Sequence, residues 1–237
     1  PAKCHWMQSS APWLGHIIAT DGIRPNPSKI QPILQLAFPK TITELRSFIG
    51  FINFYRNFWH RRAEIMAPLT ALSGRSKGKL EQTPELLRAF NAVKAMIAEN
   101  VLLSFPDPNI IYDVYTDASD YQLGGVIMQE GKTIAFFSRK LSKSQLKYPT
   151  IDKEMLCIVE IFKEFRPILW GAHIRVHTDH QNLTRQTITS NRIMTWRMLL
   201  EEFSPTFHYI KGPDNIIADA LSRPVSYTHL TLPTILL

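Results

Sequence analysis

The spacing of apolar residues changes near residue 109, from helical stripes upstream to short alternating runs downstream. The downstream pattern predicts, in order, strands over 110–117, 124–129 and 133–139, a helix from Thr150 to near Gly171, a strand over 174–179, a helix over 191–203, a strand over 206–210 and a helix from Asp214 to Pro224. Strand–helix–strand connections favour parallel neighbours. The order therefore predicts an α/β fold, with a mixed five-stranded sheet flanked by helices.

The upstream half predicts a mainly helical segment. Thr41 and Glu44 have the T-x-x-E spacing of a capping box, and apolar residues at helical spacing follow over about 42–57. A second helix is predicted to have Thr83 as its N-cap and Pro84 as its first residue. The strand-rich segment is thus expected to be preceded by at least two amphipathic helices.

The region around residues 104–109, which contains Pro106 and Pro108, is the predicted boundary between the two segments. Residues 1–109 hold 13 Lys and Arg against 7 Asp and Glu, whereas residues 110–223 hold 14 against 13. The positive charge of the chain is therefore concentrated upstream. A cationic nucleic-acid-binding segment joined to a carboxylate-centred catalytic segment would show this distribution, and two unrelated solvated surfaces would show it too.

Two Thr-Asp pairs end predicted strands. Asp117 lies at the end of the first strand and Asp179 at the end of the fourth. If these strands are parallel neighbours, their carboxyl ends lie side by side, where open α/β sheets build their sites. The two aspartates would then face each other across one strand spacing of about 4.8 Å.

Two further carboxylates are predicted to reach the same place. Glu154 borders the apolar stripe of its helix and so faces the sheet, and Asp219 lies in the opening turns of the last helix. Carboxylates gathered in this way require shared protons or bound divalent metal. Oxygen ligands suit two Mg²⁺ ions about 3.5–4 Å apart, with Mn²⁺ as the alternative, and such a pair supports phosphodiester hydrolysis. Any one of these acids alone is more often a helix cap or a surface charge.

Four short motifs surround these acids: T-D-A-S at 116–119, K-E at 153–154, T-D-H at 178–180 and N-x-x-A-D-A-L-S-R at 215–223. They resemble the ribonuclease H domain of gypsy-type LTR retrotransposon Pol polyproteins. The resemblance implies a ribonuclease H-like fold and assigns the catalytic and metal-binding roles to four acids: Asp117, Glu154, Asp179 and Asp219. It implies a two-metal endonuclease that hydrolyses the RNA strand of RNA–DNA hybrids. The alternative is a catalytically inactive, hybrid-binding remnant of a degenerate element.

The upstream half resembles the same polyproteins through L-G-H at 14–16, D-G-I at 21–23, L-R-S-F-I-G at 45–50, Y-R-N-F at 55–58 and P-L-T at 68–70. The resemblance implies that residues 1–30 end the polymerase palm, that residues 31–109 are the thumb and connection, a basic hybrid-binding segment, and that residues 110–224 are the ribonuclease H domain. Four arginines are candidates for gripping phosphates, with ordinary solvated charge as the alternative: Arg46, Arg56, Arg61 and Arg62.

A reverse transcriptase polymerase site needs paired aspartates, and the chain contains no Asp-Asp dipeptide. Polymerisation is therefore not expected of this chain, although the resemblance implies a parent RNA-directed DNA polymerase. The implied partners are the RNA–DNA hybrid, the upstream polymerase fingers and palm, and the downstream integrase. No signal peptide opens the chain, and no uncharged stretch reaches the ~20 residues needed to span a bilayer, so no membrane association or secretion is expected. The expected location is the cytoplasm or a virus-like particle, with the nucleus as the alternative.

Three smaller features carry expectations of their own. Pro167 lies late in the long helix and should kink or shorten its last turn. His208 or Tyr209 could replace the proton-transfer histidine of cellular ribonucleases H, or be ordinary strand residues. The family pattern ends after Pro224, so residues 225–237 stay unassigned and are expected to be foreign sequence, and the start at Pro1 indicates a piece of a longer protein.

Overall fold

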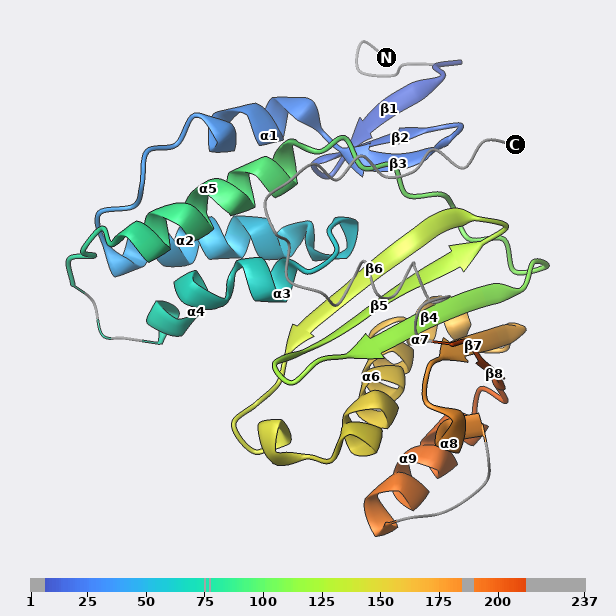
Figure 1. Cartoon of the computed structure of the whole chain (residues 1–237). Helices are drawn as coiled ribbons and strands as arrows, with labels where there is room; N and C mark the ends of the chain where they lie inside the picture. Colours follow the sequence, from blue (N-terminus) through green and yellow to red (C-terminus); the bar gives the residue numbers. More distant parts are fainter. Residues whose placement is uncertain (1–6, 75, 77, 185–189, 212–237) are drawn as a thin grey trace.

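The computed structural model describes residues 7–74, 76, 78–184 and 190–211. Its buried apolar residues form two clusters, one running from Ile30 to Leu103 and the other from Tyr112 to Phe203. Figure 1 shows the helices of the first cluster gathered beside an edge strand of a larger sheet, which has its own helices and belongs to the second cluster. Below, the part of the chain up to Leu103 is called the helical half, and the part from Tyr112 on is called the sheet half.

The helical half begins with a small antiparallel sheet of three strands: β1 (Ser10–Trp13), β2 (His16–Ala19) and β3 (Gly22–Pro25). The turn between β1 and β2 has positive φ angles at Leu14 (42°) and Gly15 (86°). Gly22 is required by a close approach, because a Cβ there would lie 2.2 Å from the carbonyl oxygen of Leu103. This sheet was not predicted, since strands of four residues are too short to show a clear alternation.

The helices of this half are α1 (Pro27–Leu34), α2 (Ile42–Phe54), a 3-10 turn (Arg56–Phe58), α3 (Arg62–Ile65), α4 (Ala67–Ser73) and α5 (Pro84–Ala98). The predicted caps of α2 and α5 are confirmed: Thr41 Oγ1 accepts from the Glu44 amide at 3.2 Å, and Thr83 Oγ1 from the Leu86 amide at 3.3 Å. The Glu44 carboxylate accepts from the Lys40 amide at 2.8 Å, one residue before the position expected for a capping box.

The sheet half contains β4 (Tyr112–Ala118), β5 (Gln122–Gln129), β6 (Lys132–Lys140), β7 (Ile174–Thr178) and β8 (Thr206–Tyr209), in the order β6-β5-β4-β7-β8. β5 pairs antiparallel with both β4 and β6, whereas β7 runs parallel to both β4 and β8. The predicted mixed five-stranded sheet flanked by helices is confirmed.

The helices of the sheet half are α6 (Thr150–Glu164), α7 (Arg166–Leu169), α8 (Gln181–Thr184) and α9 (Asn191–Glu201), and a short 3-10 turn (Gln145–Lys147) precedes α6. Figure 1 shows α6 crossing under the sheet, with α8 and α9 beyond it. Met155, Ile158 and Phe162 of α6 are fully buried. The sheet allows this close contact at Gly125, where a Cβ would lie 2.4 Å from Ile161 Cδ1.

The single long helix predicted from Thr150 to near Gly171 is wrong in its second part. α6 ends at Glu164, and α7 begins at Arg166 with Pro167 in its first turn. The first turn of a helix does not need the amide hydrogen that proline lacks, so Pro167 starts a new helix instead of bending the old one. The predicted shortening at Pro167 is thereby confirmed.

Some predictions fall on residues outside those that the structure describes. They include the last helix from Asp214 to Pro224, the acid Asp219 within it, and residues 225–237. Among the helices that the structure does describe, none has the length and apolar character needed to span a bilayer.

Candidate metal centre

The carboxyl ends of β4 and β7 lie side by side, as the sequence predicts. The parallel register pairs Tyr115 with His177, so Asp117, near the end of β4, and Asp179, directly after the end of β7, each follow two residues later. The intervening Thr116 is fully buried, and its hydroxyl donates to the His177 carbonyl at 3.4 Å. This junction fixes the backbone from which both aspartates project.

Glu154 reaches the same place from the first turns of α6. Only 2% of Glu154 is exposed, and its Oε1 accepts from the Ala118 amide at the end of β4 at 3.0 Å. Its Oε2 is buried and has no hydrogen-bond partner within the described part of the chain. The predicted orientation of Glu154 toward the sheet is therefore confirmed.

The surroundings of Glu154 favour its neutral form when no cation is bound. Burial, followed by the negative charges of Asp117 and Asp179, raises the pKa of Glu154 well above its usual value. The Ala118 amide acts in the opposite direction but does not compensate. A positive charge at this point would remove the main reason for the shift.

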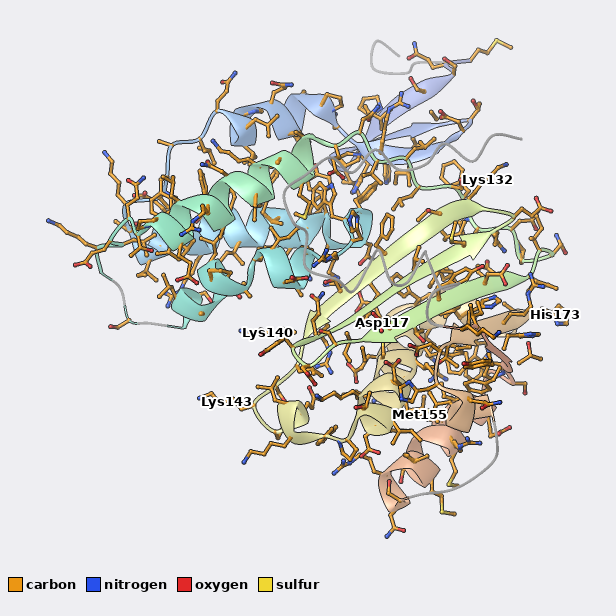
Figure 2. All side chains as sticks on the ribbon, in the orientation of Figure 1. Asp117, Lys132, Lys140, Lys143, Met155 and His173 are labelled. Atoms are coloured by element: carbon orange, nitrogen blue, oxygen red, sulfur yellow. The ribbon has the colours of Figure 1, made fainter. Side chains whose placement is uncertain are left out.

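A cysteine of α6 contacts the backbone of Asp117. The buried thiol of Cys157 donates to the Gly124 carbonyl at 3.1 Å and lies 3.6 Å from the Asp117 carbonyl. Figure 2 shows Asp117 near the tip of β4, above the part of α6 that carries Met155. Burial, with the nearby Glu154 and Asp117 charges, raises the pKa of the Cys157 thiol, so this thiol stays protonated and serves as a donor.

Glu154, Asp179 and His180 form a cluster whose potential ligand atoms all lie within 4.8 Å of one another. His180 Nδ1 is 3.2 Å from Asp179 Oδ1. Two carboxylates and an imidazole fit a divalent cation, all the more because one oxygen of Glu154 is buried and has no hydrogen-bond partner among the described residues. His180 is absent from the predicted site, although its place in the T-D-H motif directly after Asp179 was the signal that could have identified it.

The structure therefore brings together Asp117, Glu154 and Asp179, three of the four predicted acids. The fourth, Asp219, lies outside the described residues. Both candidates for proton transfer, His208 and Tyr209, are exposed on β8, next to β7. Their proposed role stays a prediction.

The four predicted phosphate-gripping arginines all interact within the protein. Arg46 is exposed and donates to the Ser73 carbonyl at 2.8 Å. The other three lie where the two halves meet: Arg56 pairs with Glu164 of α6, Arg62 donates to the Ser138 carbonyl of β6 at 3.2 Å, and Arg61 is buried against Glu64. That these arginines also bind nucleic acid stays a prediction.

One of these contacts reaches the turn beside the metal centre. Glu64 Oε2 accepts from Arg61 Nη2 at 2.6 Å and from Gln122 Nε2 at 3.1 Å. Gln122 begins β5, and its backbone amide and carbonyl both bond to Ser119, the residue after Ala118. The helical half is thus connected to the β4–β5 turn that follows Asp117.

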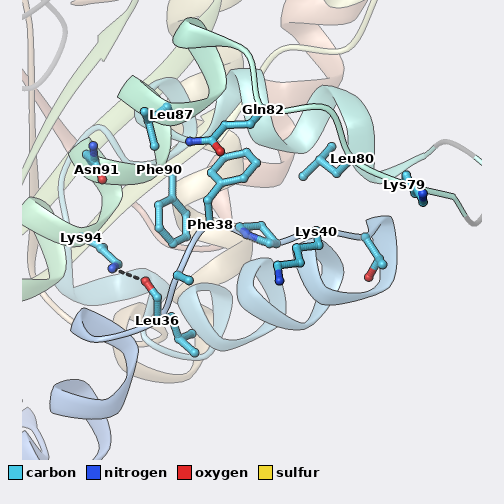
Figure 3. Close-up of a pocket in the computed structure, with 13 residues that line it drawn as sticks. Leu36, Phe38, Lys40, Lys79, Leu80, Gln82, Leu87, Phe90, Asn91 and Lys94 are labelled. Atoms are coloured by element: carbon cyan, nitrogen blue, oxygen red, sulfur yellow. Dashed lines mark hydrogen bonds between the residues drawn. The ribbon is translucent and has the colours of Figure 1, made fainter.

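A separate pocket of about 680 Å³ lies in the helical half, between the 36–41 segment, the 79–82 segment and α5. Figure 3 shows Phe38 and Phe90 at its centre and the amino group of Lys94 directed at the Leu36 carbonyl. None of the three predicted catalytic acids that the structure describes, Asp117, Glu154 and Asp179, lines this pocket. The metal centre and the pocket are therefore different places in the molecule.

Comparison with protein families identifies residues 107–203 as matching the RNase H-like domain found in reverse transcriptase. The chain is 37% identical over 224 residues to the Pol polyprotein of transposon 297 and 31% over 236 residues to that of transposon gypsy, both from Drosophila melanogaster. Each match covers 93% of the chain, and 21% and 23% of the respective relatives. The chain thus spans about a fifth of the length of the curated relatives it matches.

Two solved structures are similar along most of the chain. The foamy viral protease-reverse transcriptase in complex with RNA/DNA hybrid has a TM-score of 0.79 at 23% identity, covering 96% of this chain and 32% of that one. The same enzyme in complex with dsDNA has a TM-score of 0.75 at 24% identity, covering 86% and 45%. At this identity the similarity establishes the fold.

Proposed function

Because this chain belongs to the Pol polyproteins of gypsy-type LTR transposons and carries their RNase H-like domain, we propose that it hydrolyses the RNA strand of RNA–DNA hybrids. One observation carries the proposal. Glu154 and Asp179 converge with His180 within 4.8 Å at the carboxyl edge of the parallel strands, beside Asp117. A domain that only bound nucleic acid would have no need to gather these acids there and to bury Glu154.

The proposed roles follow from the positions of the three described acids and, for Asp219, from the sequence motif. Asp117, Glu154 and Asp179, with Asp219 as the fourth acid of the sequence motif, would hold two divalent cations, Mg²⁺ by preference and Mn²⁺ as the alternative. When bound, such cations supply Lewis-acid stabilisation and an activated water for phosphodiester hydrolysis. Glu154 is held in place by the Ala118 amide, which leaves its Oε2 available to a cation.

The helical half is proposed to hold the hybrid. Residues 1–30 would be the end of the polymerase palm, residues 31–109 the thumb and connection, residues 110–224 the ribonuclease H domain, and residues 225–237 an unassigned tail. The basic excess of residues 1–109 supports an electrostatic role for this half. The wide minor groove of a hybrid displays the 2′-hydroxyls that distinguish its RNA strand.

The remaining partners are proposed from the parent polyprotein. They are the polymerase fingers and palm upstream and an integrase downstream, in the cytoplasm or a virus-like particle, with the nucleus as the alternative location. The parent would be an RNA-directed DNA polymerase. This chain is proposed to contribute the nuclease alone, because it has no Asp-Asp dipeptide to serve a polymerase site.

The experiment is cleavage of a labelled RNA–DNA hybrid by the purified chain with Mg²⁺, repeated with Asp117→Asn. We expect internal cuts in the RNA strand that need both the metal and Asp117. If the unmodified chain retains the hybrid without cutting it, the alternative function holds, which is that of an inactive hybrid-binding remnant.

A further inference from the structure

The backbone of His180 is hydrogen-bonded to the end of β7, next to the metal centre. Its amide donates to Thr178 Oγ1 at 3.2 Å, at the point where β7 ends and α8 begins, and Thr178 itself is fully buried. The side chain of His180 is 30% exposed. The fold therefore fixes the backbone of His180, and its partly exposed ring contacts Asp179.

The distance between His180 and Asp179 is that expected of two ligands of one cation. Donor atoms at about 2.1 Å from an octahedrally coordinated cation are separated by about 3.0 Å at adjacent positions. His180 Nδ1 and Asp179 Oδ1 are 3.2 Å apart. The same distance also permits a hydrogen bond between the two side chains. The pair can therefore form a hydrogen bond in the metal-free protein and bind a cation in the metal-bound protein.

Glu154 supplies an independent indication that a ligand binds here. Its buried Oε2 has no hydrogen-bond partner among the described residues, and a buried carboxylate oxygen without a partner is costly. Glu154 also belongs to the cluster of potential ligand atoms that includes His180. A cation bound by the cluster would satisfy this oxygen directly.

We propose that His180 is a nitrogen ligand of one of the cations, which makes this position a mixed site of Glu154, Asp179 and His180. The inference rests on the proposed function, to which it adds a ligand. Mg²⁺ is bound mainly through oxygen, whereas Mn²⁺ binds imidazole more readily. This position therefore favours Mn²⁺ over Mg²⁺.

The test is an electron spin-echo measurement of Mn²⁺ bound to the tag-free full chain, which detects ¹⁴N coupling from a coordinated imidazole. We expect this coupling in the unmodified chain and its loss in His180→Ala and in the more conservative His180→Asn. The exposed His173→Asn is the matched control and should keep the coupling. His180→Ala should also weaken Mn²⁺ binding by at least about tenfold, with a smaller effect on Mg²⁺.

Bound Mn²⁺ without ¹⁴N coupling in the unmodified chain would overturn the proposal and place His180 outside the coordination sphere, as a hydrogen-bond donor to Asp179. Failure of the chain to bind Mn²⁺ at all would overturn it as well. The hybrid-cleaving function is judged separately by the Mg²⁺ cleavage assay. Cleavage without ¹⁴N coupling would reject the histidine ligand alone, and coupling without cleavage would reject the nuclease alone.

Discussion

The backbone amide of Ala118 donates a 3.0 Å hydrogen bond to the carboxylate of Glu154. This bond joins the end of β4, which carries Asp117, to the first turns of α6. It leaves the second oxygen of Glu154 buried and without a hydrogen-bond partner in the described ranges, beside Asp179 and His180. The fold thus fixes the position of Glu154 in the metal-free protein.

Replacement of Glu154 by Gln should abolish metal-dependent cleavage and preserve the fold. The amide keeps the shape of the side chain, but it removes the negative charge that holds a cation. We expect the single-turnover rate with Mg²⁺ to fall at least about 100-fold, which corresponds to roughly 3 kcal/mol of transition-state stabilisation. Near-normal cleavage by a folded Glu154→Gln chain, checked by circular dichroism, would remove Glu154 from the active site.

The same residue predicts how the stability of the metal-free chain depends on pH. Burial and neighbouring charges raise the folded-state pKa of Glu154 above its unfolded value of about 4.3. Its contribution to stability is therefore fully present below about pH 4.3 and is lost as the pH rises through the folded-state pKa. The amide side chain introduced by Glu154→Gln cannot lose a proton. The free energy of unfolding of this variant should therefore increase relative to that of the unmodified chain as the pH rises.

The measurement is the free energy of unfolding in urea, with a chelator present, from about pH 4.3 upward through the folded-state pKa of Glu154. The exposed Glu201→Gln is the matched control and should run parallel to the unmodified chain. Saturating divalent metal should remove the advantage of Glu154→Gln, since the bound cation stabilises the ionised carboxylate. A constant difference between Glu154→Gln and the unmodified chain at all pH values would contradict the raised pKa.

Close packing of α6 on the sheet predicts opposite effects of the same substitution at two glycines. A Cβ at Gly125 would lie 2.4 Å from Ile161 Cδ1 and 3.0 Å from the Tyr115 carbonyl, so Gly125→Ala should destabilise the chain by about 1–3 kcal/mol. Gly50 lies inside α2 with nothing within 4 Å of such a Cβ, so Gly50→Ala should stabilise by up to about 1 kcal/mol. Thermal unfolding of both variants measures this contrast.

A second substitution identifies the cause of the Gly125 effect. Ile161→Val removes the Cδ1 atom that a Cβ at position 125 would meet, so it should recover part of the stability that Gly125→Ala loses. The carbonyl of Tyr115 would remain close, so recovery should be incomplete. Simple additivity of the two changes would show that the packing of β5 on α6 is looser than described.

The contact between the two halves should be strongest where it is buried. Glu64→Ala would leave the buried guanidinium of Arg61 without its carboxylate and remove the bond from Gln122, at a cost of about 1–3 kcal/mol. Glu164→Gln, which breaks the more exposed pair with Arg56, should cost under about 1 kcal/mol. Chemical unfolding of the two variants compares these costs, and equal effects would show that burial does not strengthen the Glu64 contact.

The sequence was most informative where the structure depends on local spacing. Thr83 caps its helix because the hydroxyl and the amide it accepts are three residues apart, and Asp117 and Asp179 meet because strand alternation and a helical crossover impose parallel pairing. The hydrogen bond from Gln122 of β5 to Glu64 depends on tertiary contact between distant segments, so local patterns gave no sign of it. His180 was missed because the sequence interpretation considered carboxylates alone as ligands, although the T-D-H motif places this histidine directly after Asp179.

The central claim is that Asp117, Glu154 and Asp179, at the ends of β4 and β7 and in the first turns of α6, belong to an active site that hydrolyses RNA in a hybrid. Its most direct test is a strand-resolved cleavage assay in Mg²⁺ that compares an RNA–DNA hybrid with duplex RNA and duplex DNA of the same sequence. We predict internal cuts in the RNA strand of the hybrid alone, with 5′-phosphate products, and no cleavage by Asp179→Asn. Intact RNA in a hybrid that the folded, unmodified chain demonstrably binds would contradict the claim.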